Sequence, residues 1–344
     1  MTLGYLKNLV ETPGIPGHEE RIRDFILREF KRYTKDVRID RLGNVVAEKR
    51  GSGKLKLMLS AHMDQIGFLI THIDKKGYLR FSPVGGFDER TLNSQRVVVH
   101  GERDLFGVIG SKPIHKQEPE EQKKVKKQKE LFIDIGVKDR KDAERYVRIG
   151  DFVSIERSFE NLLNGNVTCR GFDDRAGVAV LFETLKNLRE HEANLYFLAS
   201  TQEEVGLRGA KVASFSVTPD IGIATEVTFA THPDLEPFEV SCELSKGPAI
   251  AIGPNIHPKI FRMLRETAEE NRIPYQIDVD PMPYGTDASV IQLTKAGVAT
   301  GIVSVPLRYM HTSCEVVNIE DIENTGILIA RFAERLEDGV DLSL

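Results

Sequence analysis

The sequence lacks tryptophan, contains only three cysteines and has no long hydrophobic segment. Cys169, Cys242 and Cys314 lie far apart and form no CxxC pair, a pattern that fits a reduced intracellular protein better than a disulfide-bonded secreted one. The N-terminal residues contain no apolar signal core, and no run of about 18 apolar residues occurs anywhere. The sequence therefore predicts a soluble, cytoplasmic protein with no membrane partner.

An excess of positive charge is also absent. The chain carries 47 Lys and Arg against 52 Asp and Glu, a net charge of −5 at pH 7, which gives no electrostatic reason to expect nucleic acid as a partner. The sequence does contain 344 residues, 40% of them hydrophobic, which is enough for a packed core in one large domain or two.

Two kinds of pattern divide the chain. Near the N-terminus, apolar residues at helical spacing predict an amphipathic helix over residues 18–33, followed by short strands. From Asp174 onward, strand-like runs such as Leu195–Ser200 and Ile221–Thr225 alternate with helix-like segments. This alternation predicts an α/β fold in which helices cover both faces of a sheet.

Between about residue 68 and residue 165 the pattern changes. Short apolar stretches alternate with Gly-, Asp- and Lys-rich turns, and no long helix is indicated. We therefore expect an α/β domain formed by residues 1–67 and 166–344, interrupted by a small β-rich domain over residues 68–165. Within this insertion, the charged segment Glu118–Glu130 fits an exposed loop or a loop that contacts another subunit.

Residues able to bind metal ions or transfer protons follow the predicted strands. In open α/β sheets the carboxyl ends of the strands line the ligand cleft, so side chains at these positions gather in one place. Two histidines with several carboxylates suit a pair of divalent cations such as zinc, cobalt or manganese, bridged by one carboxylate. The positions are His62 and Asp64, Asp173, Glu203 and Glu204, Glu226, and His311.

Each position has an ordinary explanation when taken singly. An isolated histidine after a strand is more often a hydrogen-bonded core or surface residue, and a Glu-Glu pair is usually surface charge. Asp173 and Asp174, which precede a predicted helix, fit an N-cap. Coincidence at five independent positions is the weaker explanation, so the sequence favours a two-metal site.

Five motifs resemble those of a known family. SAHMDQIGF, GFDDRAGVA, STQEEVGLRGA, GTDASVIQ and RYMHTSCEVV are similar to motifs of the M42 metallopeptidases, also called tetrahedral or TET aminopeptidases. The resemblance runs nearly end to end and includes GVIGSKPIH and LFIDIGV in the predicted insertion. It implies a dimetal-peptidase α/β sheet and a barrel-like insertion that serves dimerisation.

The resemblance also implies roles for the candidate residues. One metal would be bound by His62 and Glu226 and the other by Glu204 and His311, with Asp173 bridging the two. Glu203 would be the general acid/base, and the peptide bond after Asp173 would be cis. Asp64 would accept a hydrogen bond from His62, the support that a histidine ligand usually needs.

The implied activity is that of an aminopeptidase acting on short peptides. Two cations would lower the pKa of a shared water, and Glu203 would take its proton and deliver it to the leaving amine. The cofactors would be two divalent ions per subunit, Zn²⁺ or Co²⁺, with Mn²⁺ as a further candidate. The partners would be other copies of the chain, in a tetrahedral dodecamer built from dimers.

Three other functions stay open. A glycosidase needs two carboxylates facing each other across the sugar, about 5–9.5 Å apart, and it would leave His62 and His311 without roles. A non-catalytic peptide-binding shell would be favoured if one of the ligand positions held a residue that cannot bind metal. All five positions hold residues that can bind metal. The family usually has Asp where this chain has Glu226, which keeps a metal-dependent deacylase or carboxypeptidase open.

Overall fold

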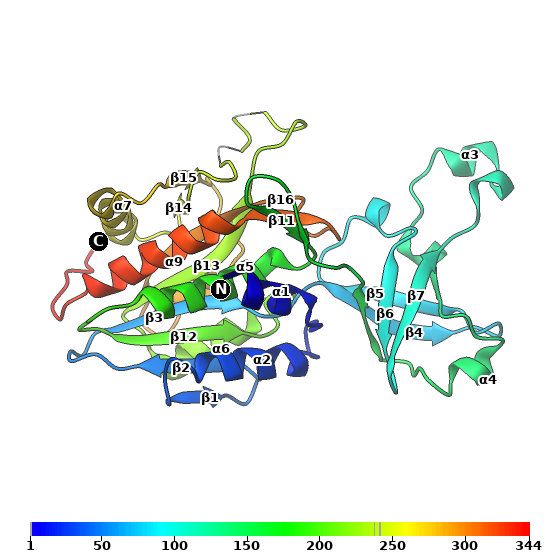
Figure 1. The fold of residues 1–344 in the computed structure, drawn as a ribbon, viewed down its shortest axis with the longest axis horizontal. Coiled ribbons are helices and arrows are strands. Elements are labelled where there is room, and N and C mark those ends of the chain that lie inside the picture. Colours follow the sequence, from blue (N-terminus) through cyan, green and yellow to red (C-terminus); the bar gives the residue numbers. More distant parts are fainter. Residues whose placement is uncertain (1, 237, 241) are drawn as a thin grey trace.

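The computed structural model describes residues 2–236, 238–240 and 242–344. These residues form a mixed α/β body and a small β-barrel, which lie at opposite ends of the longest axis of the molecule (Figure 1). Among the described residues, the helices are too short or too polar to cross a membrane.

The body is built around one large sheet of 11 strands. Its order is β1-β2-β12-β3-β13-β16-β17-β11-β10, and β14 and β15 are attached beside β16. The four central strands β12, β3, β13 and β16 run parallel, so their carboxyl ends reach the same edge. The strands are β1 (Val37–Ile39), β2 (Val45–Lys49), β3 (Lys56–His62), β10 (Glu160–Asn161), β11 (Asn166–Cys169), β12 (Asn194–Ser200), β13 (Ile221–Phe229), β14 (Ala249–Ile252), β15 (Gln276–Val279), β16 (Ala299–Arg308) and β17 (Glu315–Asn318).

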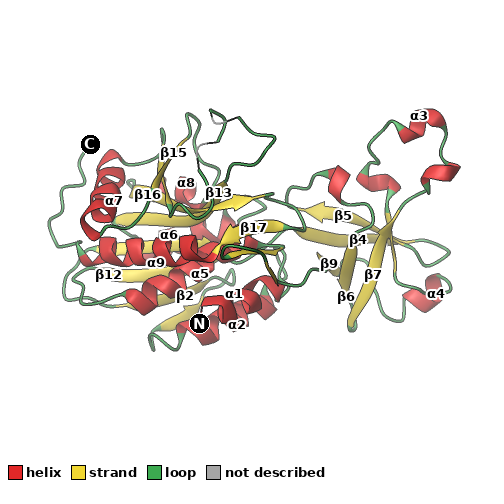
Figure 2. Cartoon of the chain, turned by 45° about the horizontal axis from the view of Figure 1, so that its top comes forward, coloured by secondary structure: helices red, strands yellow, loops and turns green. Residues whose placement is uncertain are grey.

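Helices cover both faces of this sheet, as the sequence predicted (Figure 2). Alternate residues of β3 explain why: Leu57 and Leu59 belong to the main core cluster, whereas Met58 belongs to a separate cluster on the other side. The main core also contains apolar residues of α1 (Thr2–Glu11), α2 (Glu20–Phe30), α5 (Phe172–Asn187), α7 (Pro258–Asn271) and α9 (Ile319–Glu334). The opposite face is covered by α6 (Arg208–Val217) and α8 (Asp287–Gln292).

The second body is a closed, six-stranded antiparallel barrel in the order β4-β5-β8-β7-β6-β9. It has its own hydrophobic core, to which β6 contributes Val97 and Val99 at alternate positions. Its strands are β4 (Gly67–Ile73), β5 (Leu79–Val84), β6 (Arg96–His100), β7 (Asp104–Gly110), β8 (Phe132–Asp134) and β9 (Phe152–Ile155), and two short helices, α3 (Pro119–Gln122) and α4 (Arg140–Ala143), lie in its loops. The predicted fold class, an α/β sheet interrupted by a β-rich insertion, is confirmed.

The chain returns from the barrel to the large sheet before residue 165. Strand β10, inside the segment predicted as the insertion, pairs with β11 in the large sheet. The barrel also contacts the α/β body directly, because Nη1 and Nη2 of Arg21 on α2 both donate to the carboxylate of Asp104 on β7. The predicted charged segment includes α3, which lies at the tip of the barrel far from the sheet (Figure 1).

Candidate dimetal active site

The predicted site residues gather at the carboxyl edge of the central strands. His62 ends β3, while Glu203 and Glu204 follow β12 and His311 follows β16. Glu226 lies within β13 rather than at its end. Asp173 lies in the first turn of α5, where the backbone is not helical, and its peptide bond to Asp174 is cis, as the resemblance implied.

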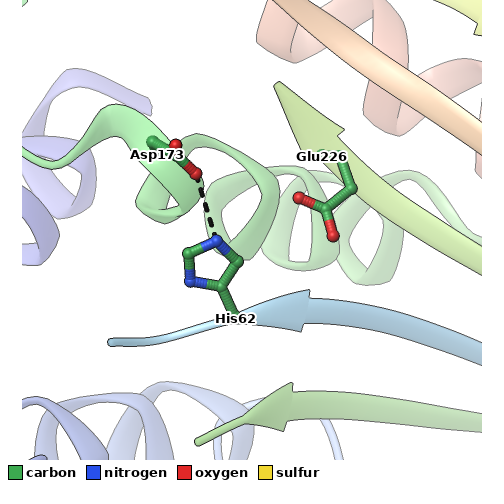
Figure 3. A group of neighbouring side chains, drawn as sticks. All are labelled: His62, Asp173 and Glu226. Carbon is green, nitrogen blue, oxygen red and sulfur yellow. Dashed lines mark hydrogen bonds and ion pairs between the residues drawn. The ribbon is translucent and has the colours of Figure 1, made fainter. Parts of the chain in front are cut away.

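Two groups of potential metal ligands share one carboxylate. The first group is His62, Asp173 and Glu226, and the second is Asp173, Glu204 and His311; within each group the ligand atoms lie within 4.8 Å of one another. In the first group the three side chains face a common space from β3, α5 and β13 (Figure 3).

Asp173 is placed to bridge the two groups. Its Oδ1 lies 3.1 Å from Nε2 of His62, and its Oδ2 lies 3.1 Å from Nε2 of His311. Each carboxylate oxygen therefore faces a different histidine. The two glutamates divide in the same way, because Glu204 Oε1 is 3.4 Å from His311 Nε2 and Glu203 Oε2 is 3.8 Å from His62 Nε2.

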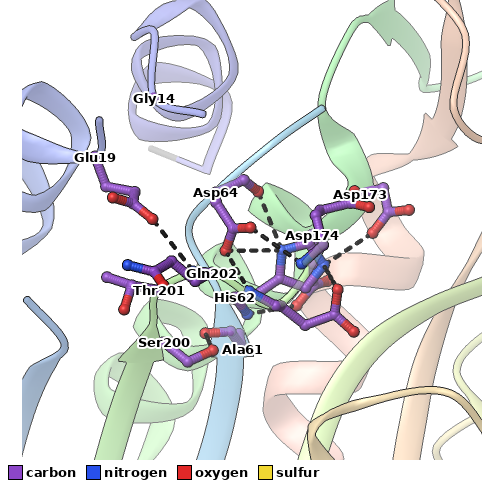
Figure 4. Close-up of polar contacts among 12 residues, drawn as sticks. Gly14, Glu19, Ala61, His62, Asp64, Asp173, Asp174, Ser200, Thr201 and Gln202 are labelled. Carbon is purple, nitrogen blue, oxygen red and sulfur yellow. Dashed lines mark hydrogen bonds and ion pairs between the residues drawn. The ribbon is translucent and has the colours of Figure 1, made fainter. Parts of the chain in front are cut away.

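Asp64 contacts His62 through its backbone carbonyl group. Nδ1 of His62 lies 3.0 Å from the backbone carbonyl oxygen of Asp64, whereas the nearest carboxylate oxygen is 3.7 Å away. The buried carboxylate instead accepts the backbone N–H groups of Glu203 and Glu204, each at 3.1 Å. Asp64 lies beside His62 in Figure 4. Asp64 therefore fixes both the tautomer of His62 and the loop that carries the two glutamates.

Two supporting carboxylates were not predicted. Glu315 is buried and accepts the backbone N–H groups of both His311 and Asp173, at 3.0 and 3.3 Å. Asp287, also buried, accepts the hydroxyl groups of Ser60 and Ser200 and so joins β3 to β12 beneath the site. Both residues fall inside motifs that the sequence displays, but nothing in residue type or spacing distinguishes them from ordinary surface acids.

The site contains more acidic than basic side chains, and burial perturbs their pKa values. Burial raises the pKa of Glu203 to about 8 and that of Glu226 well above its usual range. Hydrogen bonds with Asp173 and Glu204 raise the pKa of His311 to about 11. Oε1 of Glu226 is buried and has no hydrogen-bond partner among the described residues. A buried, unpartnered carboxylate oxygen in a cluster of acids is the environment that a bound cation stabilises.

A cleft gives access to these side chains. A cavity of about 560 Å³ is lined by residues of both ligand groups and by Leu207, Thr286 and Met310. The barrel contributes Gly86 to the wall; a Cβ atom there would lie 3.3 Å from Nδ1 of His311. The site is therefore formed by both bodies of the molecule.

Comparison with known proteins agrees with this geometry. Residues 43–328 match the model of the M42 glutamyl aminopeptidase family. The chain belongs to the M42 peptidase family. It is an aminopeptidase, a hydrolase of peptide bonds, and its fold is that of the TET aminopeptidases.

Individual relatives match nearly the whole chain. The lysyl aminopeptidase of Pyrococcus furiosus is 40% identical over 96% of both chains. The structure of an aminopeptidase from the archaeon Desulfurococcus kamchatkensis superposes with a TM-score of 0.92 at 40% identity, covering 97% of this chain and 95% of the other. The TET1 peptidase of Pyrococcus horikoshii, which can assemble into a tetrahedron or a large octahedral shell, superposes with a TM-score of 0.87 at 36% identity, covering 98% of this chain and all of the other (100%).

Proposed function

We propose that this aminopeptidase works through two divalent cations, one held by His62 and Glu226, the other by Glu204 and His311, with Asp173 bridging. The observation that carries this proposal is the placement of the Asp173 carboxylate, each of whose oxygens faces a different histidine. The donor set of imidazole nitrogens and carboxylate oxygens suits Zn²⁺, Co²⁺ or Mn²⁺.

The chain's own residues would handle the protons. When bound, the two cations supply Lewis acidity, which makes a water more acidic and stabilises negative charge on the scissile carbonyl oxygen. Glu203 belongs to neither ligand group yet lies beside His62, so its carboxylate is free to take a proton from the attacking water. The same carboxylic acid then donates this proton to the leaving amine. Asp64 holds the backbone of Glu203 during both steps.

Metal removal tests the proposal directly. We expect two metal ions per subunit by elemental analysis, complete loss of peptidase activity after chelation, and recovery on addition of Zn²⁺, Co²⁺ or Mn²⁺. Full activity in a sample shown to be metal-free would overturn the dimetal mechanism. An acetylated peptide should be cleaved far more slowly than its free counterpart, and rapid internal cleavage of the blocked peptide would indicate an endopeptidase.

A glycosidase fits this geometry less well. Both histidines point their Nε2 atoms at the one carboxylate of Asp173, an arrangement that a pair of carboxylates acting across a sugar does not require. Chelator sensitivity measured on peptide and polysaccharide substrates separates the two activities.

We also propose that the barrel mediates assembly into dimers and, through them, a dodecamer. Phe106 and Val108 on β7 alternate with residues that face the barrel interior and are 70% and 48% exposed. Ile149, in the loop that precedes β9, is 61% exposed. Exposed apolar side chains of this size are typical of protein interfaces.

A cytoplasmic location also stays a prediction, and the three free cysteines agree with it.

A further inference from the structure

The 560 Å³ cleft that contains the candidate metal ligands opens into a second cavity of about 640 Å³. The two cavities are adjacent, because both are lined by Val227, Gly285, Thr286 and Met310. A substrate bound at the candidate metal site can therefore extend into the second cavity. The second cavity is built from the end of β13, from β15 and the loop that follows it, and from residues 238–240.

The charged side chains that line the second cavity are all acidic. Asp278, Asp280 and Glu239 line the second cavity, and no lysine or arginine lines either cavity in the described part of the chain. A carboxylate side chain entering the second cavity would meet three like charges and no counter-ion, whereas a cationic side chain would find three partners.

Asp278 is the acid best placed to bind a ligand. It lies on β15 and is half-buried, as is Asp280, whereas Glu239 is exposed. Its Oδ2 accepts a hydrogen bond from the hydroxyl group of Thr228 at 2.9 Å, which fixes the orientation of the carboxylate. Burial raises the pKa of Asp278, so an approaching ammonium or guanidinium group would favour the ionised form.

The rest of the wall suits a long side chain with a charged end. Val227 and Met310 line both cavities, and Tyr284 adds further apolar surface in the second cavity. The Tyr284 hydroxyl donates to the backbone carbonyl of Asp278 at 2.9 Å, which leaves the ring to pack against a ligand. Lysine and arginine combine an apolar stem with a cationic head, and so match this order of surfaces.

We propose that the second cavity receives the side chain of the substrate's N-terminal residue and selects lysine and arginine, with Asp278 as the principal counter-charge. This inference rests on the proposed dimetal aminopeptidase site, which fixes where the N-terminal residue must lie. Asp280 and Glu239 add further attraction, and salt screens the contribution of the exposed Glu239 most strongly.

The test compares aminoacyl-p-nitroanilides, in which only the N-terminal side chain varies. For the metal-loaded wild-type enzyme we expect kcat/KM for the lysyl substrate to exceed that for the norleucyl substrate, which has the same unbranched stem without the amine, by about 10- to 100-fold. Asp278→Asn keeps the size of the side chain and an acceptor for Thr228. It should lower the lysyl-to-norleucyl ratio by a similar factor.

Asp234→Asn is the matched control, since it removes one negative charge from the same region but does not line either cavity. The ratio of kcat/KM for the lysyl substrate to that for the norleucyl substrate should be the same in Asp234→Asn as in the wild type. Inactivity of the metal-loaded wild type on every substrate would contradict the proposed function itself. An active enzyme that prefers glutamyl substrates, or that treats lysyl and norleucyl substrates alike, would overturn this inference alone. Asp278→Asn that slows both substrates equally would also overturn it.

Discussion

Glu203 and Glu204 are neighbours in sequence but face different histidines, and this difference assigns them different roles. Glu203→Gln keeps the size of the side chain but cannot accept a proton from water. It should lower kcat by about 10²- to 10⁴-fold while two metals remain bound. Glu204→Gln replaces an anionic ligand with a weaker neutral one, so it should lose metal first and regain part of its activity in excess metal.

Metal content and kcat, measured side by side for the two variants, check this assignment. Loss of metal in Glu203→Gln with retention in Glu204→Gln would mean that the roles are exchanged. If neither substitution changes rate or metal content, the site lies elsewhere.

A second prediction concerns the buried carboxylates that hold the ligands by their backbones. Asp64 and Glu315 each accept two backbone N–H groups, one with each oxygen. Asp64→Asn and Glu315→Gln leave only one acceptor oxygen and set an amide N–H₂ group against the second backbone N–H. We expect the metal dissociation constant to rise about 10- to 100-fold in each variant.

Competition with a chelator of known affinity measures this effect. Circular dichroism shows that each variant is folded, so that a weaker affinity reflects the site. Unchanged metal affinity in both variants would show that these carboxylates do not position the ligands.

The positions of the candidate metal ligands could be predicted from sequence because most of them end or follow a strand or begin a helix within a distinctive motif, although Glu226 lies inside β13. The supporting contacts could not. Asp64 was expected to accept a hydrogen bond from His62, but the sequence could not show that the acceptor is its backbone carbonyl, because backbone acceptors leave no trace in residue type. Glu315 was missed because a lone acid four residues after His311 resembles any surface acid until the fold buries it.

At the scale of elements, the close packing of α9 on α5 depends on Gly326. A Cβ atom at this position would lie 2.4 Å from Cβ of Glu183 on α5. This distance is too short for two non-bonded carbon atoms, so one of the helices would have to move. Gly326→Ala should therefore lower the free energy of unfolding by about 1–3 kcal/mol, despite the better helix propensity of alanine.

Gly4 on α1 supplies the control, because a Cβ atom there would meet nothing within 4 Å. Gly4→Ala should be neutral or should stabilise the protein by up to about 1 kcal/mol. Denaturant unfolding at fixed protein concentration compares the two. Equal stability of the two variants would show that α5 and α9 can separate at little cost.

Strongly patterned elements could be predicted, and weakly patterned ones could not. Helix α2 was expected over residues 18–33 and runs over Glu20–Phe30, because its apolar spacing is regular. Strands β14 and β15 went unpredicted: each has four residues, and pairing with a neighbour rather than local sequence makes them strands. Since β15 carries Asp278, the composition of the second cavity could not be predicted either.

At the scale of the whole molecule, the prediction concerns assembly through the barrel. Phe106→Glu places a charge on the outer face of β7, where the side chain is already 70% exposed, so the barrel itself should remain folded. If this face is buried between subunits, the charge would have to be desolvated without a partner and the contact should fail. Light scattering at micromolar concentration should then give a smaller mass than for the wild type.

Leu163→Glu is the control, since Leu163 is 83% exposed in the turn between β10 and β11, on the large sheet rather than on the barrel. Its mass should equal that of the wild type. Both ligand groups come from one chain, so the Phe106→Glu variant should keep its kcat per subunit on a small p-nitroanilide within about threefold. A monomeric wild-type protein, or dissociation by Leu163→Glu alone, would contradict assembly through the barrel. If the Phe106→Glu variant has both a smaller mass and a much lower kcat, a neighbouring subunit completes the active site.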